Sequence, residues 1–428
     1  MPSFKELIAK LRSRSSRAAT GNDNRASTAN GNGQKSAPAP VPAAQANQNQ
    51  QVMASATAPT LTVSLKNASS SSAVYVYVTG QALDNGNRPM FLQSDGVTIY
   101  YPASPATVGS PLAADVAIPL GAPGTTKNVT IPRIAGGRVW FAIGGKLTFA
   151  LNPGPGVVEP SVSNPSDPNI NINWGFCEFT YNSDQLFANI SCVDFISIPV
   201  ALTLTGTSGT VQSVPGLPAN GLTTIVNGLK QQAASDGRPW DKLVYPATGT
   251  PLRVLSPLKL LDSSATAWDG YWDNYVNQVW TRFSSTDMTV NTQAAAGNVT
   301  GRVSNGQLSL GSAGTFSKPN ARDIWTCSEG PFATGDNAAR NAVIPRLAAA
   351  FNRSTLLDAT QFPNGSTPAN YYKNATTNHY SRLVHQTMKD GRGYAFPYDD
   401  VVPDGGADVA GTVFDGSPSN WTIAIGGS

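Results

Sequence analysis

The decisive stretch of this sequence reads EPSVSNPSDPNININWGFCEFTYNSDQLFANISCVDFISIPVAL and spans Glu159–Leu202. Two runs in it are dense in aromatic and branched side chains, Asn171–Asn182 and Phe187–Val200, and this composition predicts two β-strands. Each run carries one acidic residue, Glu178 in the first and Asp194 in the second. A carboxylate inside a strand is unfavourable for propensity and for burial, so both positions require a reason.

The alternation of side chains along the first strand places Glu178, Thr180 and Asn182 on one face. These groups form a row of hydrogen-bond donors and acceptors, which is a surface suited to sugar hydroxyls. Turn formers follow, and we predict a hairpin whose loop is centred near Leu186 and in which Glu178 pairs with Asp194. The sequence does not fix the register, and a slip of one residue would send one carboxylate to the opposite face.

Two carboxyl groups on one concave surface are the minimum for hydrolysing a glycosidic bond. One of them donates a proton to the leaving oxygen, and the other activates water or attacks the sugar. The alternative is that both acids are solvated residues on the exposed face of an antiparallel sheet. Their spacing alone is compatible with both interpretations.

Three segments of the stretch closely resemble glycoside hydrolase family 64, namely NPSDPN (Asn164–Asn169), WGFCEFTYN (Trp174–Asn182) and NISCVDF (Asn189–Phe195). The similarity extends from about Pro59 to the C-terminus, and its last strong segment is GYAFPYDDV (Gly393–Val401). Members of this family are β-1,3-glucanases with a thaumatin-like β-sandwich. They cut laminarin-type glucan into short oligosaccharides with inversion at the anomeric carbon.

The resemblance implies specific roles for five residues of the stretch. Glu178 corresponds to the general acid of the family, and Asp194, sixteen residues on, corresponds to the general base. Thr180 and Asn182 match positions that contact glucan, and Phe187 stands where family members can place a tryptophan against the sugar.

The tail contains a second polar cluster, at the turn that follows a short predicted strand. The resemblance implies that this segment faces the substrate, so that Asp399 or Asp400 bonds a glucose hydroxyl. The alternative is an Asx-type turn in which both acids accept from backbone amides.

Charge excludes some classes of partner. The formal net charge is +3, but Met1–Ala58 carries seven Lys and Arg and two acids, which leaves 22 basic and 24 acidic residues and a net charge of −2 for the remainder. A mildly acidic body argues against a nucleic-acid partner, whereas a neutral polysaccharide needs no charge steering. No apolar run reaches the ~20 residues of a membrane span, and no secretory pattern is visible.

Cysteine and histidine give no sign of a metal or disulfide framework. Cys177, Cys192 and Cys327 have no zinc spacing, and we expect buried free thiols. His379 and His385 lie six residues apart, which does not place them on one helical face as a metal pair, so we expect surface or packing roles. We predict no metal and no organic cofactor.

The fold class predicted from these patterns is mainly β: a thaumatin-like β-sandwich or barrel with a mixed α/β insertion that forms a wide groove. We predict a disordered basic tail over residues 1–58, a sandwich with the catalytic hairpin over 59–205, a mixed α/β subdomain over 206–390 and a C-terminal return segment over 391–428.

Individual elements follow from periodicity. Alternation predicts that Leu61–Asn67 and Ala73–Thr79 form the first hairpin of the sandwich. Helical spacing predicts four helices: one through Leu222–Ala233 that ends at Gly237, one through Trp272–Phe283, one over Ala338–Asn352 with Pro345 as a kink, and one through Tyr380–Met388. The aromatic stripe of the second helix favours core packing over a sugar platform.

The sequence therefore predicts an inverting β-1,3-glucanase that acts as a monomer on a glucan chain. One alternative is a non-catalytic thaumatin-like protein that binds glucan or has antifungal activity. The other is a structural β-sandwich assembly protein with a basic arm. The compartment stays open, although the family resemblance points to an extracellular location.

Overall fold

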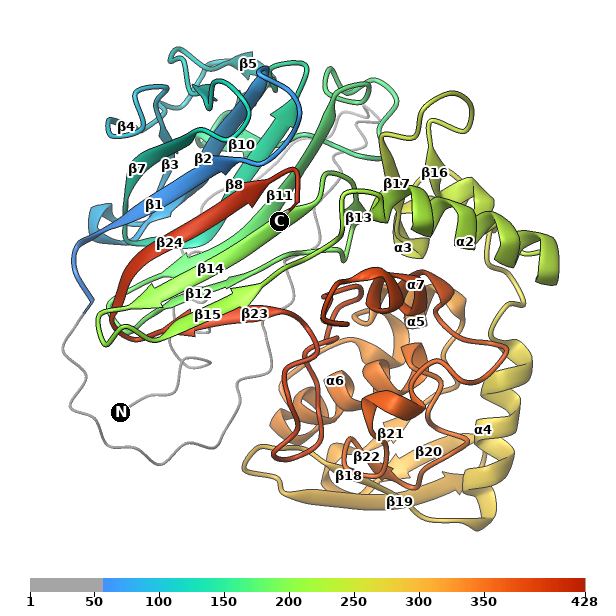
Figure 1. The fold of residues 1–428 in the computed structure, drawn as a ribbon. Coiled ribbons are helices and arrows are strands. Elements are labelled where there is room, and N and C mark those ends of the chain that lie inside the picture. Colours follow the sequence, from blue (N-terminus) through green and yellow to red (C-terminus); the bar gives the residue numbers. More distant parts are fainter. Residues whose placement is uncertain (1–56, 428) are drawn as a thin grey trace, which may run out of the picture. The chain divides into compact units, whose positions relative to one another are not determined.

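The computed structural model describes residues 57–427, and this part of the chain is mainly β with several sheets (Figure 1). One large sheet has the strand order β15 (Val211–Val214), β14 (Val200–Gly206), β24 (Pro418–Ile425), β1 (Thr60–Asn67) and β7 (Thr126–Pro132). The other has the order β23 (Thr412–Asp415), β12 (Leu186–Asn189), β11 (Asn173–Tyr181), β8 (Ile134–Ile143), β2 (Val74–Ala82), β3 (Arg88–Leu92) and β4 (Ile99–Tyr100), with β6 (Ile118–Pro119) paired to β2.

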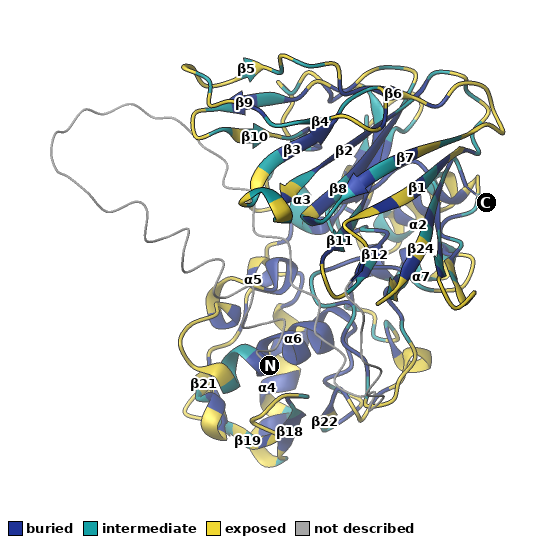
Figure 2. Ribbon diagram, turned by 90° about the vertical axis from the view of Figure 1, so that its left-hand side faces the viewer, coloured by how far each residue is buried: buried dark blue, intermediate teal, exposed yellow. Residues whose placement is uncertain are grey.

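The two large sheets share one apolar core, which makes them a sandwich. Strands alternate, so every second side chain of β1 and β2, such as Leu65 and Val78, lies in the same buried cluster. Across the core, the ring of Phe179 on β11 lies 5.1 Å from that of Trp421 on β24, centroid to centroid. Figure 2 shows buried residues along these strands, with exposed residues mainly in loops.

The outer face of the sheet that contains β11 carries a second cluster, rich in aromatic rings. Trp140 of β8 contacts Phe176 of β11 at 5.0 Å between centroids, and Phe176 contacts Phe195 at 5.7 Å. Segments from the small sheet of β10 (Gly156–Val158), β9 (Ala150–Asn152) and β5 (Ser110–Pro111) help to cover this cluster. The cover leaves Glu178, two residues beyond Phe176, partly exposed at its border.

The remaining elements form smaller sheets and helices. A short sheet has the order β13 (Phe195–Ile196), β17 (Arg253–Leu255) and β16 (Val244–Tyr245), and another has the order β21 (Thr315–Phe316), β20 (Gln307–Leu310), β19 (Asn298–Ser304), β18 (Met288–Asn291) and β22 (Gln361–Phe362). The α-helices are α2 (Gly221–Asp236), α3 (Pro257–Leu260), α4 (Asp273–Ser285), α5 (Ala321–Thr326), α6 (Ala338–Asn352) and α7 (His379–Thr387).

The four predicted helices are present. Helix α2 ends where predicted, because Gly237 takes the left-handed conformation with φ 69° and its N–H donates to the Ala233 carbonyl. Helix α6 has the predicted bounds and contains Pro345. The aromatic stripe of α4, including Trp280 and Phe283, is buried, so its role is core packing.

The prediction that the first two strands form a hairpin is wrong. Strand β1 pairs with β24 in parallel and with β7, whereas β2 pairs with β3, β6 and β8 of the other sheet. The serine-rich connection crosses from one sheet to the other, and the side chain of Asn67 holds it: it donates to the Ser71 and Gly121 carbonyls and accepts from the Ser69 hydroxyl.

Several predictions stay open after the fold is known. The strands of the sandwich continue to Val214 and return at β24, and the proposed division into domains stays a prediction. The thaumatin-like type and the wide groove also stay predictions. Nearly all of the tail over residues 1–58 lies outside the described residues. Within residues 57–427, none of the helices has the length and apolarity to cross a membrane.

Candidate functional site

The candidate general acid lies on the outer face of β11, as predicted from alternation. Cys177, Phe179 and Tyr181 belong to the inner core, so Glu178 and Thr180 project from the other side of the strand. The side chain of Glu178 keeps 22% of its surface exposed. It is therefore accessible to a ligand that lies across the outer face of the sheet.

An arginine from the neighbouring strand forms an ion pair with this carboxylate. Arg138 of β8 is the cross-strand partner of Glu178, and its Nε and Nη2 donate to Glu178 Oε1 at 3.3 and 3.2 Å. Its Nη1 donates to Glu159 Oε2, and its guanidinium lies 4.7 Å from the centroid of the Phe176 ring. One cation is thus shared between two carboxylates and held by an aromatic face.

Glu159, which directly follows strand β10, is the second carboxylate that pairs with Arg138. Burial raises the pKa of the Glu159 carboxyl, and the charges of Glu178 and Asp194 raise it further, while Arg138 opposes them. The charge of Asp194 also acts on Arg138. The structure therefore brings three carboxylates and one guanidinium into one electrostatic neighbourhood.

Asp194 occupies the loop before β13, so the prediction of one continuous strand from Phe187 to Val200 is wrong. Strand β12 ends at Asn189, and residues outside the hairpin hold Asp194 in place. Its carbonyl accepts from the Ser256 N–H at 2.9 Å, and its Oδ1 lies 3.4 Å from Lys259 Nζ of helix α3. Its side chain is 35% exposed.

The predicted pairing of the two acids across a hairpin is also wrong. Strands β11 and β12 do form a hairpin, but its turn is tighter than predicted, and Asn189 is the residue opposite Glu178. The side chain of Asn182 makes this turn, because its Oδ1 accepts from the backbone amides of Asp184 and Gln185 at 2.9 Å each. Asp194 therefore reaches the site through the loop that follows β12.

The predicted sugar-contacting residues have different surroundings. Thr180 and Phe187 are cross-strand partners on the outer face and are both partly exposed. Asn182 is 8% exposed and its oxygen is used in the turn, so the structure gives it a structural role at this position.

Asp399 has no exposed surface, so the prediction that it bonds a glucose hydroxyl is wrong. Its carboxylate accepts from Arg353 Nη2 at 2.9 Å, from His385 Nε2 at 2.9 Å and from the Ala395 N–H at 3.1 Å. These bonds bury the carboxylate in a structural network. One of the three donors is a backbone amide, as in the Asx-type alternative, and the other two are side chains. Asp400 is partly buried, and its contact with sugar stays a prediction.

Tyr394 connects the C-terminal segment to the site, and the sequence did not predict a role for it. Its carbonyl accepts from the Cys192 N–H at 2.8 Å, two residues before Asp194. Burial raises the pKa of the Tyr394 hydroxyl, and the charges of Asp400 and Glu178 raise it further. The hydroxyl of Tyr394 is therefore under the electrostatic influence of an acid of the tail and of an acid of the hairpin.

Sequence reasoning also missed Arg138, Glu159 and Lys259. Arg138 is a single cation inside an otherwise apolar run, a signal of the same kind as the acid in β11. Glu159 opens the stretch that carries the family motifs, and Lys259 stands alone in an apolar segment. None of these signals specifies a partner, because each partner lies on another element.

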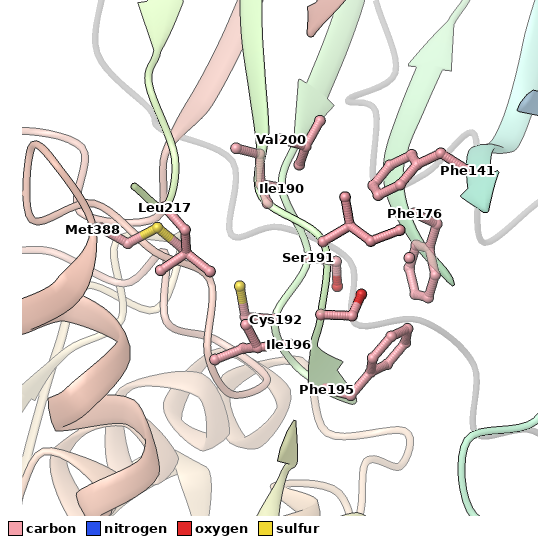
Figure 3. A pocket seen from close by; sticks show the side chains of 13 residues that line it. Phe141, Phe176, Ile190, Ser191, Cys192, Phe195, Ile196, Val200, Leu217 and Met388 are labelled. Atoms are coloured by element: carbon pink, nitrogen blue, oxygen red, sulfur yellow. The ribbon is translucent and has the colours of Figure 1, made fainter. Parts of the chain in front are cut away.

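A small cavity lies under the loop that carries Asp194, and it is too small for a sugar. Figure 3 shows apolar side chains converging on it, including Phe141, Phe176, Ile190 and Phe195. Its volume of about 20 Å³ has room for about one water molecule. The cavity therefore belongs to the packing behind the site.

The three cysteines are the buried free thiols that the sequence predicts. Cys177, Cys192 and Cys327 are free and buried. In the part of the chain that the structure describes, no three His, Cys, Asp or Glu side chains converge as a metal site.

Comparison with known proteins gives one family. The model of glycoside hydrolase family 64, described as beta-1,3-glucanase, matches residues 59–425. The chain is 32% identical over 310 residues to a glucan endo-1,3-beta-glucosidase of Cellulosimicrobium cellulans, which covers 70% of this chain and 53% of the relative. It is 33% identical over 323 residues to a protein of the same name from Arthrobacter sp. (strain YCWD3), with 70% and 56% covered. The chain thus spans about half the length of these curated relatives.

Solved structures agree in fold. The structure of a laminaripentaose-producing beta-1,3-glucanase in complex with laminaritetraose is 32% identical, with a TM-score of 0.76 and coverage of 86% of this chain and 99% of that one. A beta-1,3-glucanase domain from Clostridium beijerinckii is 20% identical, with a TM-score of 0.64 and coverage of 86% and 99%. At this lower identity the likeness concerns the fold alone.

Proposed function

This chain belongs to glycoside hydrolase family 64, and from this premise we propose that it hydrolyses β-1,3-glucan and releases short oligosaccharides. The observation that carries the proposal is the placement of Glu178 and Asp194. Both carboxylates are partly exposed, and both act on the same pair formed by Arg138 and Glu159. Two accessible carboxyl groups in one neighbourhood are what glycoside hydrolysis requires.

In the proposed mechanism Glu178 donates its proton to the glycosidic oxygen as the bond from that oxygen to the anomeric carbon breaks. Asp194 takes a proton from a water molecule, whose oxygen bonds to the opposite face of the same carbon. The product is a hemiacetal of inverted configuration. Asp194 then releases its proton and Glu178 regains one from solvent. Lys259 and the Ser256 amide hold Asp194 in place.

The proposed partner is a neutral β-1,3-glucan chain, and the reaction as written requires no metal and no organic cofactor. We further propose a monomer that binds neither nucleic acid nor membrane. Sedimentation of the full chain tests the oligomeric state.

The two acids can be tested separately. We expect Glu178→Gln to reduce laminarin hydrolysis about 10²- to 10⁴-fold. The same variant should retain most activity on a dinitrophenyl β-laminarioside, because that leaving group needs no proton. We expect Asp194→Asn to be impaired on both substrates and to be rescued by azide, which replaces the activated water and gives a glycosyl azide of inverted configuration.

A matched control is Asp184→Asn, since Asp184 is an exposed acid in the turn of the same hairpin and should leave activity unchanged. Proton NMR of the first product identifies the anomer. Unchanged laminarin hydrolysis by Glu178→Gln would remove the general-acid assignment, and a retained anomer would remove the role of Asp194. Tight laminarin binding without release of reducing ends by the natural chain would select the non-catalytic glucan-binding alternative.

A further inference from the structure

The outer face next to Glu178 carries two rows of side chains across three strands. In antiparallel strands, directly opposite residues project from the same face. Glu178 is opposite Asn189, and Asn189 is opposite Thr412 of strand β23. The next row begins at Thr180, which is opposite Phe187, and Phe187 is opposite Phe414 of β23.

The intervening row confirms which face this is. Phe179, Ala188 and Val413 are mutually opposite in the same way, and all three are buried in the core between the two large sheets. Phe187 and Phe414 therefore project outward, on the side of Glu178. The polar row and the aromatic row lie side by side on one surface.

Phe414 is unusual in its exposure. In residues 57–427, five large hydrophobic side chains are exposed; four of them are valines, and the fifth is Phe414 at 47%. An exposed aromatic ring is unfavourable because its apolar surface contacts water, and a ligand that covers the ring removes this cost. Because Phe414 lies on the face that carries Glu178, the ligand available to cover it is the one proposed to bind at Glu178.

The backbone of Phe414 is clamped, so its ring is presented from a fixed point. Its N–H donates to Gln212 Oε1 at 3.2 Å, and its carbonyl accepts from Gln212 Nε2 at 2.6 Å. Gln212 of β15 thus occupies the open edge of strand β23 at this residue. A peptide strand could not pair there without displacing it, which argues against a β-strand partner as the occupant.

The neighbouring polar row supplies hydrogen-bonding groups for a neutral ligand. Asn189 is 7% exposed, and its Nδ2 has no hydrogen-bond partner among the described residues. Thr180 and Thr412 are partly exposed on the same face. A sugar ring has apolar C–H faces and polar edges, so it matches an aromatic row beside a row of hydroxyl and amide groups.

We propose that Phe414, together with Phe187, forms a sugar-binding platform over which the glucan chain runs from Glu178 across strands β12 and β23. The platform deepens the proposed function and rests on it. Strands are spaced ~4.8 Å apart, so Phe414 lies ~10 Å from the column of β11. Only a chain that extends beyond the sugar at Phe187 reaches Phe414, and the platform therefore favours longer oligosaccharides.

The test compares Phe414→Ala with Val211→Ala, which removes an exposed apolar side chain that belongs to β15 and to neither row. Steady-state kinetics on laminari-oligosaccharides of increasing length measure KM and kcat for each. We expect Phe414→Ala to raise KM about 3- to 10-fold for long oligosaccharides, with unchanged kcat/KM for the shortest cleaved one. Phe414→Trp, which offers a larger ring, should lower KM for the long substrates.

Binding in the Glu178→Gln background separates the two proposals. Isothermal titration with long laminari-oligosaccharides should show the same 3- to 10-fold loss for Phe414→Ala when no hydrolysis takes place. If the natural chain binds these sugars without cleaving them, the platform survives and the proposed hydrolysis fails. A loss that is equal for all lengths, a loss equal to that of Val211→Ala, or no loss at all would overturn the platform.

Discussion

Removal of the charge of Glu159 should move the pH dependence of catalysis without removing any group proposed to react. Glu159 and Glu178 share the guanidinium of Arg138, which donates to both carboxylates. The negative charges of Glu159 and Glu178 repel each other across this guanidinium. In Glu159→Gln this repulsion is lost and the guanidinium of Arg138 is left to Glu178 alone, so the alkaline limb of kcat/KM should shift to lower pH.

The magnitude follows from Coulomb's law. Two carboxylates on one guanidinium lie roughly 6 Å apart, and for effective dielectric constants from about 80 to 20 their repulsion is about 0.7 to 2.8 kcal/mol. Glu159 and Glu178 are 34% and 22% exposed, so solvent screening favours the lower part of this range. A value of about 1 kcal/mol corresponds to a shift of about 0.5 to 1 pH unit.

The assay is kcat/KM for laminarin between acidic and alkaline pH, measured for three variants. Arg138→Gln removes the opposite charge and should move the alkaline limb to higher pH. Asp287→Asn breaks an exposed ion pair with Arg302 elsewhere and should leave the limb in place. If Glu159→Gln and Arg138→Gln move the limb in the same direction, or lower kcat without moving it, the shared-charge reasoning is refuted.

The remaining predictions concern stability and reactivity. Burial lowers the pKa of His379 to about 4, so unfolding becomes easier by about 2 to 4 kcal/mol as pH falls from ~6.5 to 4, and urea denaturation of His379→Gln should lack this loss. Burial disfavours the charged form of His385, but the neighbouring carboxylate of Asp399 raises its pKa overall. The stability that protonated His385 contributes is present below pH ~6.5 and is lost as pH rises through the raised pKa, and His385→Gln should remove this pH dependence from the free energy of unfolding. Gly137→Ala would place Cβ 2.6 Å from the Phe179 ring, and thermal unfolding should show a cost of about 1 to 3 kcal/mol. Burial raises the pKa of Cys192 to about 12, so this thiol should react with a disulfide reagent only after denaturation.

Local patterns in this sequence predicted local structure well. Helix α6 has the predicted bounds, and Gly237 ends α2, because periodicity and capping depend on residues a few positions apart. The same holds for the two faces of β11, since alternation depends on nothing beyond the strand.

Long-range pairing could not be predicted in this way. Strand β1 lies beside β24, at the other end of the chain and in parallel, and no pattern in either segment names its partner. Asp194 illustrates the consequence for the site. Its run has strand composition, but Phe195 and Ile196 pair with β17, and the Ser256 amide takes the Asp194 carbonyl. A distant segment decided where the second acid lies.

The position of Asp399 shows how a residue of a family motif can support the proposed site without contacting sugar. Asp399 accepts from the Ala395 N–H, which fixes the short segment that begins at Tyr394. The Tyr394 carbonyl accepts from the Cys192 N–H, and this bond anchors the loop two residues before Asp194. Arg353, at the end of helix α6, and His385 neutralise the buried carboxylate. The buried charge therefore links two helices to the loop that presents the proposed base, and its removal would leave two uncompensated cations at that junction.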